Sequence, residues 1–68
     1  IEYTLSVASK VEIDLFNTSG KKLFSTNFTK EAGNNSYNFN DMSLSSGLYL
    51  LKIKTEEYVE VIMLLKTN

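Results

Sequence analysis

The sequence predicts an all-β fold, a small immunoglobulin-like β-sandwich of six to seven antiparallel strands. Apolar and polar residues alternate with a period of two in most segments, which is typical of strands that bury one face. Turn-forming residues separate these segments at intervals of about eight to twelve residues, as in sandwiches and small barrels. No segment shows the i, i+3, i+4, i+7 apolar spacing of an amphipathic helix, so strands are expected to build the whole fold.

The first two predicted strands lie at residues 1–7 and 10–17. The alternation in the first strand predicts one face exposed to solvent and one buried face. The buried face carries Ile1, Tyr3, Leu5 and Val7. In the second strand Glu12 and Asp14 are predicted to point outward, opposite the inward residues Val11, Ile13 and Leu15. Phe16 shares the outward side, where an aromatic ring can cover a neighbouring strand.

A tight turn at residues 17–20 is predicted to join the second strand to a third. Gly20 supplies a position with positive φ at no steric cost. Residues 21–28 then return as the partner of a β-hairpin, with one face formed by Phe24, Thr26 and Phe28.

The middle of the chain is more polar. Residues 29–35 are predicted to form a surface loop that turns at Gly33. Residues 36–40 alternate again, which predicts a short strand near a sheet edge with Tyr37 and Phe39 directed inward.

A crossover at residues 41–46 is then expected to close the bottom of the core with Met42 and Leu44. A break at Gly47 leads into Leu48–Lys54, whose first six residues include five that are apolar or aromatic. A strand that is apolar on both faces lies in the middle of a sheet, so this segment is predicted to be the central strand.

The last predicted strand spans residues 58–66, after a tight turn at residues 55–57. One face carries Val59, Val61, Met63 and Leu65. Because Ile62 and Leu64 make the other face apolar too, this strand is expected to be covered on both sides at its end.

Length and composition limit the number of domains and the kinds of chemistry that the chain can carry out. The 68 residues predict one domain over residues 1–68, and 43% apolar content suffices for one core but not for a large pocket. The chain has no cysteine and no histidine, which removes thiolate metal sites, disulfides and the usual general base. The net charge of −1 gives no basic surface for nucleic acid, and no apolar run is long enough for a membrane span. We therefore expect neither an enzyme nor a bound cofactor or metal.

The chain begins in the middle of a strand pattern, at Ile1. This suggests that the domain lacks its first strand, which the longer parent protein would supply. An edge left unpaired in this way would allow two chains to dimerise by strand pairing.

Three side-chain sets have a functional and a structural interpretation. Glu12 and Asp14 share a face, as a glycosidase pair would, but a solvated outer face is the more favoured interpretation. A calcium site would need oxygen ligands, which could come from Asn34, Asn38, Asn40 and Asp41. The same residues are common in turns, so a turn-rich loop is the favoured explanation of their presence. A stacking platform for sugars or bases would need the exposed rings of Tyr3, Tyr37, Tyr49 and Tyr58. The alternation directs these side chains inward, which favours positions in the core or over the sheet.

Two segments resemble a known family in their order and spacing. Residues 11–23 read V-E-I-D-L-F-N-T-S-G-K-K-L, which is similar to that family's hairpin pattern l-y-n-x-x-G-k-x-v. Residues 44–53 read L-S-S-G-L-Y-L-L-K-I, which is similar to its pattern L-x-x-G-x-Y-x-x-k-i. The chain thus resembles, over nearly its whole length, the type A C-terminal sorting domain of the type IX (Por) secretion system of Bacteroidetes. The related immunoglobulin-like domain of flagellar hook-capping proteins shares much of this pattern.

The resemblance implies a non-catalytic signal at the C-terminal end of a larger exported protein. It implies an N-terminal cargo domain, recognition by the outer-membrane type IX translocon and cleavage by a sortase-like peptidase. The protein would pass through the periplasm to the cell surface or the extracellular space. The positions that match the family pattern are Asn17, Gly20, Lys21, Gly33, Leu44, Gly47, Tyr49 and Lys66. Two features of the family differ here, since the opening Asn-Pro element is missing and the tail has few lysines.

Two functions of different classes follow from these observations. The first is a secretion signal whose last strands dock to the export machinery, for which strand addition at an exposed edge is a natural mode. The alternative is a passive immunoglobulin-like spacer or binding module of a larger secreted enzyme, in contact with carbohydrate or protein.

Overall fold

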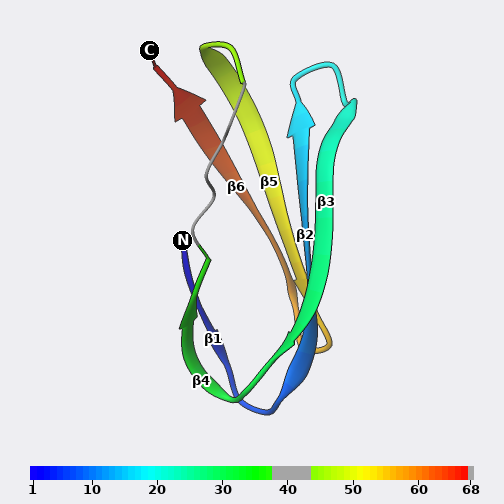
Figure 1. Ribbon diagram of the computed structural model, residues 1–68, viewed down its shortest axis with the longest axis vertical. Coiled ribbons are helices and arrows are strands. Elements are labelled where there is room, and N and C mark those ends of the chain that lie inside the picture. The colour runs from blue at the N-terminus through cyan, green and yellow to red at the C-terminus, as the bar shows by residue number, and fades with distance from the viewer. Residues whose placement is uncertain (38–43, 68) are drawn as a thin grey trace.

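Six antiparallel strands in two sheets make up the part of the chain that the computed structural model describes, residues 1–37 and 44–67 (Figure 1). The strands are β1 (Glu2–Leu5), β2 (Ser9–Asn17), β3 (Lys22–Lys30), β4 (Gly33–Ser36), β5 (Gly47–Thr55) and β6 (Val59–Lys66). The larger sheet has the order β3-β2-β5-β6, and β1 pairs with β4 in the smaller one. This confirms the predicted all-β fold, a small immunoglobulin-like sandwich.

The centre of the larger sheet is formed by β2 and β5, as predicted for the run after Gly47. Their antiparallel register places Ile13 opposite Ile53 and Leu15 opposite Leu51. Because side chains alternate along a strand, all four of these residues lie on the inner face of the sheet. Each is fully buried or nearly so.

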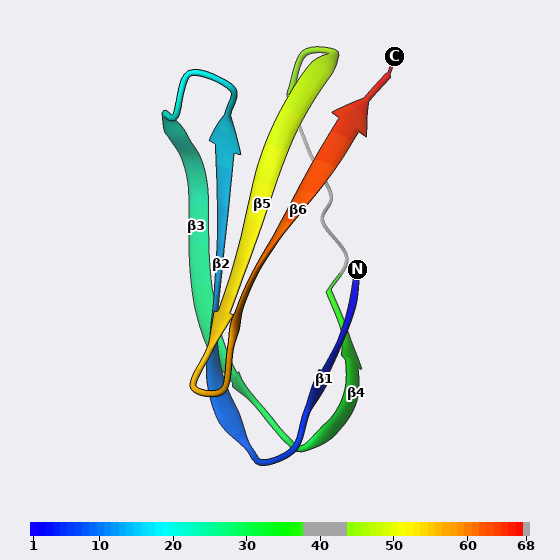
Figure 2. The ribbon, with the colours of Figure 1, turned by 180° about the vertical axis from the view of Figure 1, so that it is seen from behind.

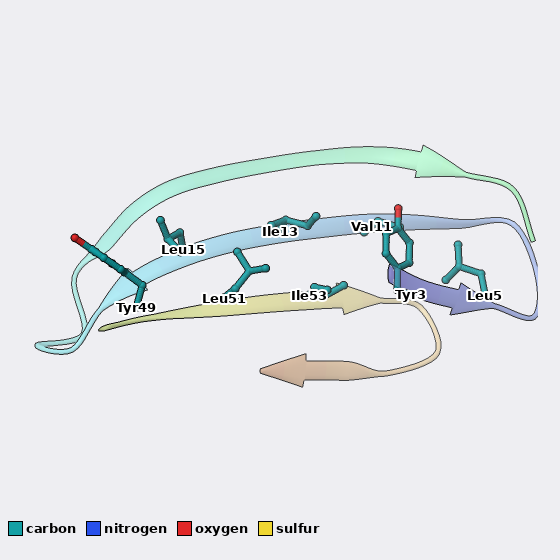
Figure 3. Packing of buried hydrophobic residues seen from close by; sticks show 8 residues of the cluster. All are labelled: Tyr3, Leu5, Val11, Ile13, Leu15, Tyr49, Leu51 and Ile53. Atoms are coloured by element: carbon teal, nitrogen blue, oxygen red, sulfur yellow. The ribbon is translucent and has the colours of Figure 1, made fainter. Parts of the chain in front are cut away.

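The hydrophobic core lies along the inner face of the larger sheet, and β1 of the smaller sheet packs over one end of it (Figure 3). Its buried members are Tyr3, Leu5, Val11, Ile13, Leu15, Tyr49, Leu51 and Ile53. The two residues from β1 lie over the end of the sheet that carries Val11 and Ile53, while Tyr49 lies at the opposite end. Each large apolar side chain contributes about 1.5–3 kcal/mol when fully buried, so this one cluster is the main source of stability.

The predicted hairpin of β2 and β3 is confirmed. Gly20 has a φ of 90°, and its N–H donates to the Asn17 carbonyl at 3.0 Å. The Asn17 side-chain oxygen also accepts hydrogen bonds from the backbone N–H groups of Ser19 (3.0 Å) and Lys21 (2.9 Å). A bulge beside Phe16 then leaves Leu23 without a residue opposite it in the register.

The prediction for the middle of the chain is wrong in its boundaries. Strand β3 continues to Lys30, and β4 lies at Gly33–Ser36, so its first three residues fall in the predicted loop and it overlaps the predicted strand at residues 36–40 only at Ser36. The reason is pairing with β1, which includes a hydrogen bond from the Thr4 hydroxyl to the Asn34 side-chain oxygen at 2.9 Å. Such tertiary pairing outweighs the low β propensity of glycine and asparagine.

The remaining predictions for this region have mixed outcomes. Tyr37 is half-buried after β4, and Leu44 is half-buried against the core, both directed inward as expected. Phe39 and Met42 lie outside the residues that the structure describes. Val7 is exposed, contrary to prediction, because β1 ends at Leu5 and the chain bends before β2 begins.

Candidate functional site

Strand β6 forms one edge of the larger sheet (Figure 2). Within residues 1–37 and 44–67 it pairs with β5 alone. In an antiparallel pair, alternate residues direct their backbone N–H and C=O groups away from the partner. The outer side of β6 therefore offers a row of backbone donors and acceptors to which a further strand can add.

Five exposed apolar side chains lie on the outer face of the sheet beside this edge. We name them the outer stripe: Leu48, Val59, Val61, Met63 and Leu65. Exposure along β6 rises from 57% at Val59 to 70% at Leu65, and the register places Leu48 opposite Leu65. A contiguous exposed apolar row marks an interaction surface.

The outer stripe corrects the prediction that the last strand is covered on both faces at its end. Ile62 and Leu64 are half-buried on the inner face and pack against the core, as expected. On the outer face, however, Met63 and Leu65 have no covering layer among the described residues. The apolar alternation of this strand was visible in the sequence, but its position at the sheet edge was not.

The opposite half of the outer face is polar and centred on Asp14. Only 1% of this residue is exposed, so the prediction that it points into solvent is wrong. The Ser25 hydroxyl donates to its carboxylate at 2.5 Å, and the Lys22 ammonium lies 3.8 Å away. Desolvation by burial acts to raise the Asp14 pKa, but the hydrogen bonds and the nearby lysines outweigh it and hold the pKa below its usual value.

This environment also bears on the carboxylate pair. Glu12 and Asp14 do share the outer face, as the alternation indicated, since they lie opposite Asn27 and Ser25 of β3. Asp14 is nevertheless enclosed by the side chains of β3 and held as an ionised partner of Lys22. Its position is that of a structural carboxylate within the sheet.

A polar clasp holds the start of β6 against the β1–β2 connection. The Glu57 carboxylate accepts hydrogen bonds from the hydroxyl and the backbone N–H of Ser6, the latter at 2.8 Å. The Tyr58 hydroxyl donates to the Thr4 carbonyl at 2.9 Å. The hydrogen bonds from the Ser6 hydroxyl and backbone lower the pKa of Glu57. Because β1 belongs to the smaller sheet, the clasp joins the two sheets at one end of the sandwich.

The positions that match the family sequence pattern are spread over turns and strand ends. Gly20 and Lys21 lie in the hairpin turn, Gly33 opens β4 with a φ of 116°, and Lys66 ends β6. The other four, Asn17, Leu44, Gly47 and Tyr49, line one open pocket of about 440 Å³ near the hairpin turn. Within it the Tyr49 hydroxyl donates to the Ser45 carbonyl at 2.6 Å.

The four tyrosines form no shared exposed platform. Tyr3 and Tyr49 are buried, and the Tyr58 hydroxyl is held by the clasp. The ring of Tyr37 stacks on that of Phe28, with centroids 5.8 Å apart and planes 8° apart. The core and sheet-covering roles predicted for these residues agree with this arrangement.

One of the four candidate calcium ligands lies among the described residues. Asn34 lies on β4, and its side-chain oxygen accepts from the Thr4 hydroxyl. Asn38, Asn40 and Asp41 lie outside the described residues. Within the described part, no three acidic side chains gather closely enough to hold a metal ion. The same residues contain no helix with the length and apolar character of a membrane span.

The small sandwich thus carries an open, apolar edge strand of the kind to which an extended segment of another protein can add. The family model for the secretion system C-terminal sorting domain matches residues 1–66, and the chain belongs to this family. No match was found among curated proteins or among solved structures. The family comprises sorting signals of type IX secretion, so the protein is exported through the outer membrane to the cell surface or the extracellular space.

Proposed function

We propose that this domain is a non-catalytic signal that directs a cargo, linked to its N-terminal side, to the type IX translocon, and that the translocon binds it at β6. The family match supports the sorting role. The outer stripe and the unpaired side of β6 support the place of binding.

The chemistry of this surface suits a partner strand. Backbone hydrogen bonds along an edge supply affinity that does not depend on the partner's sequence. The apolar side chains beside the edge add about 25 cal/mol for each Å² that the partner covers. One translocon could in this way recognise many sorting domains that share a fold but differ in surface sequence.

The opposite edge of the sheet is less suited to this role. Strand β3 begins at Lys22 and ends at Lys30, and Ser25, Asn27 and Thr29 lie exposed along it. Lysines and polar residues on an edge oppose the addition of a further strand. Strand β6 carries only Glu60 and Lys66 as charged residues.

An export assay tests both halves of this proposal. The 68-residue chain is fused to the C-terminus of a periplasmic reporter and expressed in cells with a working type IX system. We expect the reporter to reach the cell surface or the medium. The variant Val61→Lys, which places a charge in the outer stripe, is expected to leave most of the reporter in the periplasm.

Val7→Lys is the matched control, because Val7 is 57% exposed and Val61 is 58% exposed, and Val7 lies outside the outer stripe. Circular dichroism of both variants checks that they fold. A wild-type fusion that stays in the periplasm would argue against sorting and would favour a passive module. Equal export of the two variants would instead place recognition away from β6.

A further inference from the structure

The charges of β6 are arranged to complement a second copy of the same strand. Glu60 and Lys66 lie near opposite ends of β6, and the intervening residues are all apolar. Glu60 lies opposite Ile53 and Lys66 opposite Gly47, which are separated by an even number of residues, so both charges project from the same face.

We propose that two copies of this chain pair through β6 as antiparallel strands, in a register centred on Met63. In this register Glu60 of each copy lies opposite Lys66 of the other, Val61 opposite Leu65, and Ile62 opposite Leu64. The two Met63 residues face each other on the twofold axis. The larger sheets of the two copies then join into one continuous sheet, and backbone groups on the unpaired side of β6 are satisfied.

Neighbouring registers are less favourable. Residues directly opposite in a sheet must project from the same face, so the permitted registers are displaced by two residues. A displacement in one direction sets Glu60 opposite Leu64, and in the other direction it sets Lys66 opposite Ile62. Both displacements leave a charge beside an apolar side chain, whereas the register centred on Met63 forms two opposite-charge pairs.

The other edge of the sheet does not favour such a dimer. Antiparallel pairing of β3 with itself over its full length would bring Lys22 of one copy to Lys30 of the other at both ends. Like charges that face each other across strands are destabilising. The dimer is thus specific to the C-terminal edge, and this is not the N-terminal edge at which the sequence had suggested pairing.

The dimer goes beyond the sorting function and does not depend on it. It occupies the strand at which we propose that the translocon binds. The monomer is therefore the form that exposes β6 to the translocon. Before export, pairing covers the apolar edge and so prevents aggregation through it.

Disulfide cross-linking tests the register, because the chain contains no cysteine of its own. In Met63→Cys the two introduced thiols face each other across antiparallel strands, at a Cα separation within the range that a disulfide spans. We expect mild oxidation of this variant to give mostly covalent dimer.

Val59→Cys is the matched control, since it lies on the same face of the same strand and is similarly exposed. In the proposed register the two thiols introduced by this substitution lie roughly 27 Å apart along the strands. We expect this variant to remain monomeric after oxidation. Equal cross-linking of both variants, or none for Met63→Cys, would overturn the register.

Charge reversal provides a second test, with sedimentation equilibrium as the measurement. Glu60→Lys and Lys66→Glu each place two like charges in contact, so each is expected to raise the dimer dissociation constant by about tenfold or more. The double variant restores opposite charges and is expected to return the constant close to the wild-type value. A double variant as weak as the single ones would contradict the proposal, as would a wild-type chain that stays monomeric at high concentration.

The same variants distinguish the proposed edge pairing from a dimer in which the two copies exchange β6. In that arrangement Met63 lies opposite Leu50 of the other copy, as it lies opposite Leu50 within one chain here. The two thiols of the Met63→Cys variant would then not form a disulfide, so a dimer without cross-linking would exclude the edge pairing in favour of exchange.

Discussion

The environment of Asp14 differs from the one that its position in the sequence pattern predicts. It occupies an outward position of an alternating strand, yet Ser25 and Lys22 of β3 enclose it. An ionised carboxylate in such a site is stable only while these partners remain in place, because an unpaired buried charge is strongly unfavourable.

Asp14→Asn is expected to lower the free energy of unfolding by about 1–3 kcal/mol at neutral pH, because the amide loses the charge-assisted interactions with Ser25 and Lys22. Urea denaturation followed by circular dichroism measures this. Glu2→Gln is the control, since Glu2 is exposed on β1 and is expected to change stability little. Equal effects of the two substitutions would contradict the structural role of Asp14.

The same carboxylate predicts how stability depends on pH. Its pKa is lower in the folded chain than in the unfolded chain, so its contribution is fully present above the unfolded value of about 4. The contribution is lost as the pH falls from there through the folded pKa. We expect the stability difference between wild type and Asp14→Asn to shrink as the pH falls below about 4, and a constant difference would contradict this.

At the scale of elements, the clasp decides how firmly the start of β6 is held. Glu57 is exposed, and its carboxylate accepts hydrogen bonds from the hydroxyl and the backbone N–H of Ser6, across the gap between the β5–β6 turn and the β1–β2 connection. A local attachment of this kind controls opening of the region it joins more than it controls unfolding of the whole domain.

Glu57→Ala is therefore expected to increase amide hydrogen exchange at Ser6 and at the start of β6. Exchange in the central strands β2 and β5 should change little, because their pairing does not involve the clasp. Glu31→Ala is the control, as Glu31 is exposed and its side chain makes no hydrogen bond among the described residues. A uniform increase across all strands would indicate that the clasp supports the entire fold.

At the scale of the whole molecule, stability rests on one small core along the inner face of the larger sheet. A domain of this size has a net stability of only a few kcal/mol, because a short chain buries a small fraction of its surface. The loss of a single central side chain is thus comparable to the total stability.

Leu51→Ala is expected to cost about 2–5 kcal/mol, enough to unfold much of the population, because Leu51 is fully buried at the centre of the sheet. Leu48→Ala, in the same strand, removes an exposed side chain of the outer stripe and is expected to cost less than about 1 kcal/mol. Thermal and urea unfolding of both variants measures the difference. Similar losses would mean that the outer stripe is packed in solution.

Local patterns in the chain determined the all-β class, the β2–β3 hairpin with its turn at Gly20, and β5 as a central strand. Alternation and turn chemistry are properties of neighbouring residues, so they can be read without knowledge of the fold. The family pattern is visible for the same reason, since its residues lie mainly at turns and strand ends.

Tertiary structure alone decided which strands lie at an edge and what covers each face. The pairing of β1 with β4 placed a strand at Gly33–Ser36, where local propensity indicated a loop. The enclosure of Asp14 and the exposure of Val61, Met63 and Leu65 likewise depend on which strand lies alongside. Such neighbours come from distant parts of the chain, and the alternation of a strand is the same whether its apolar face meets the core or the solvent.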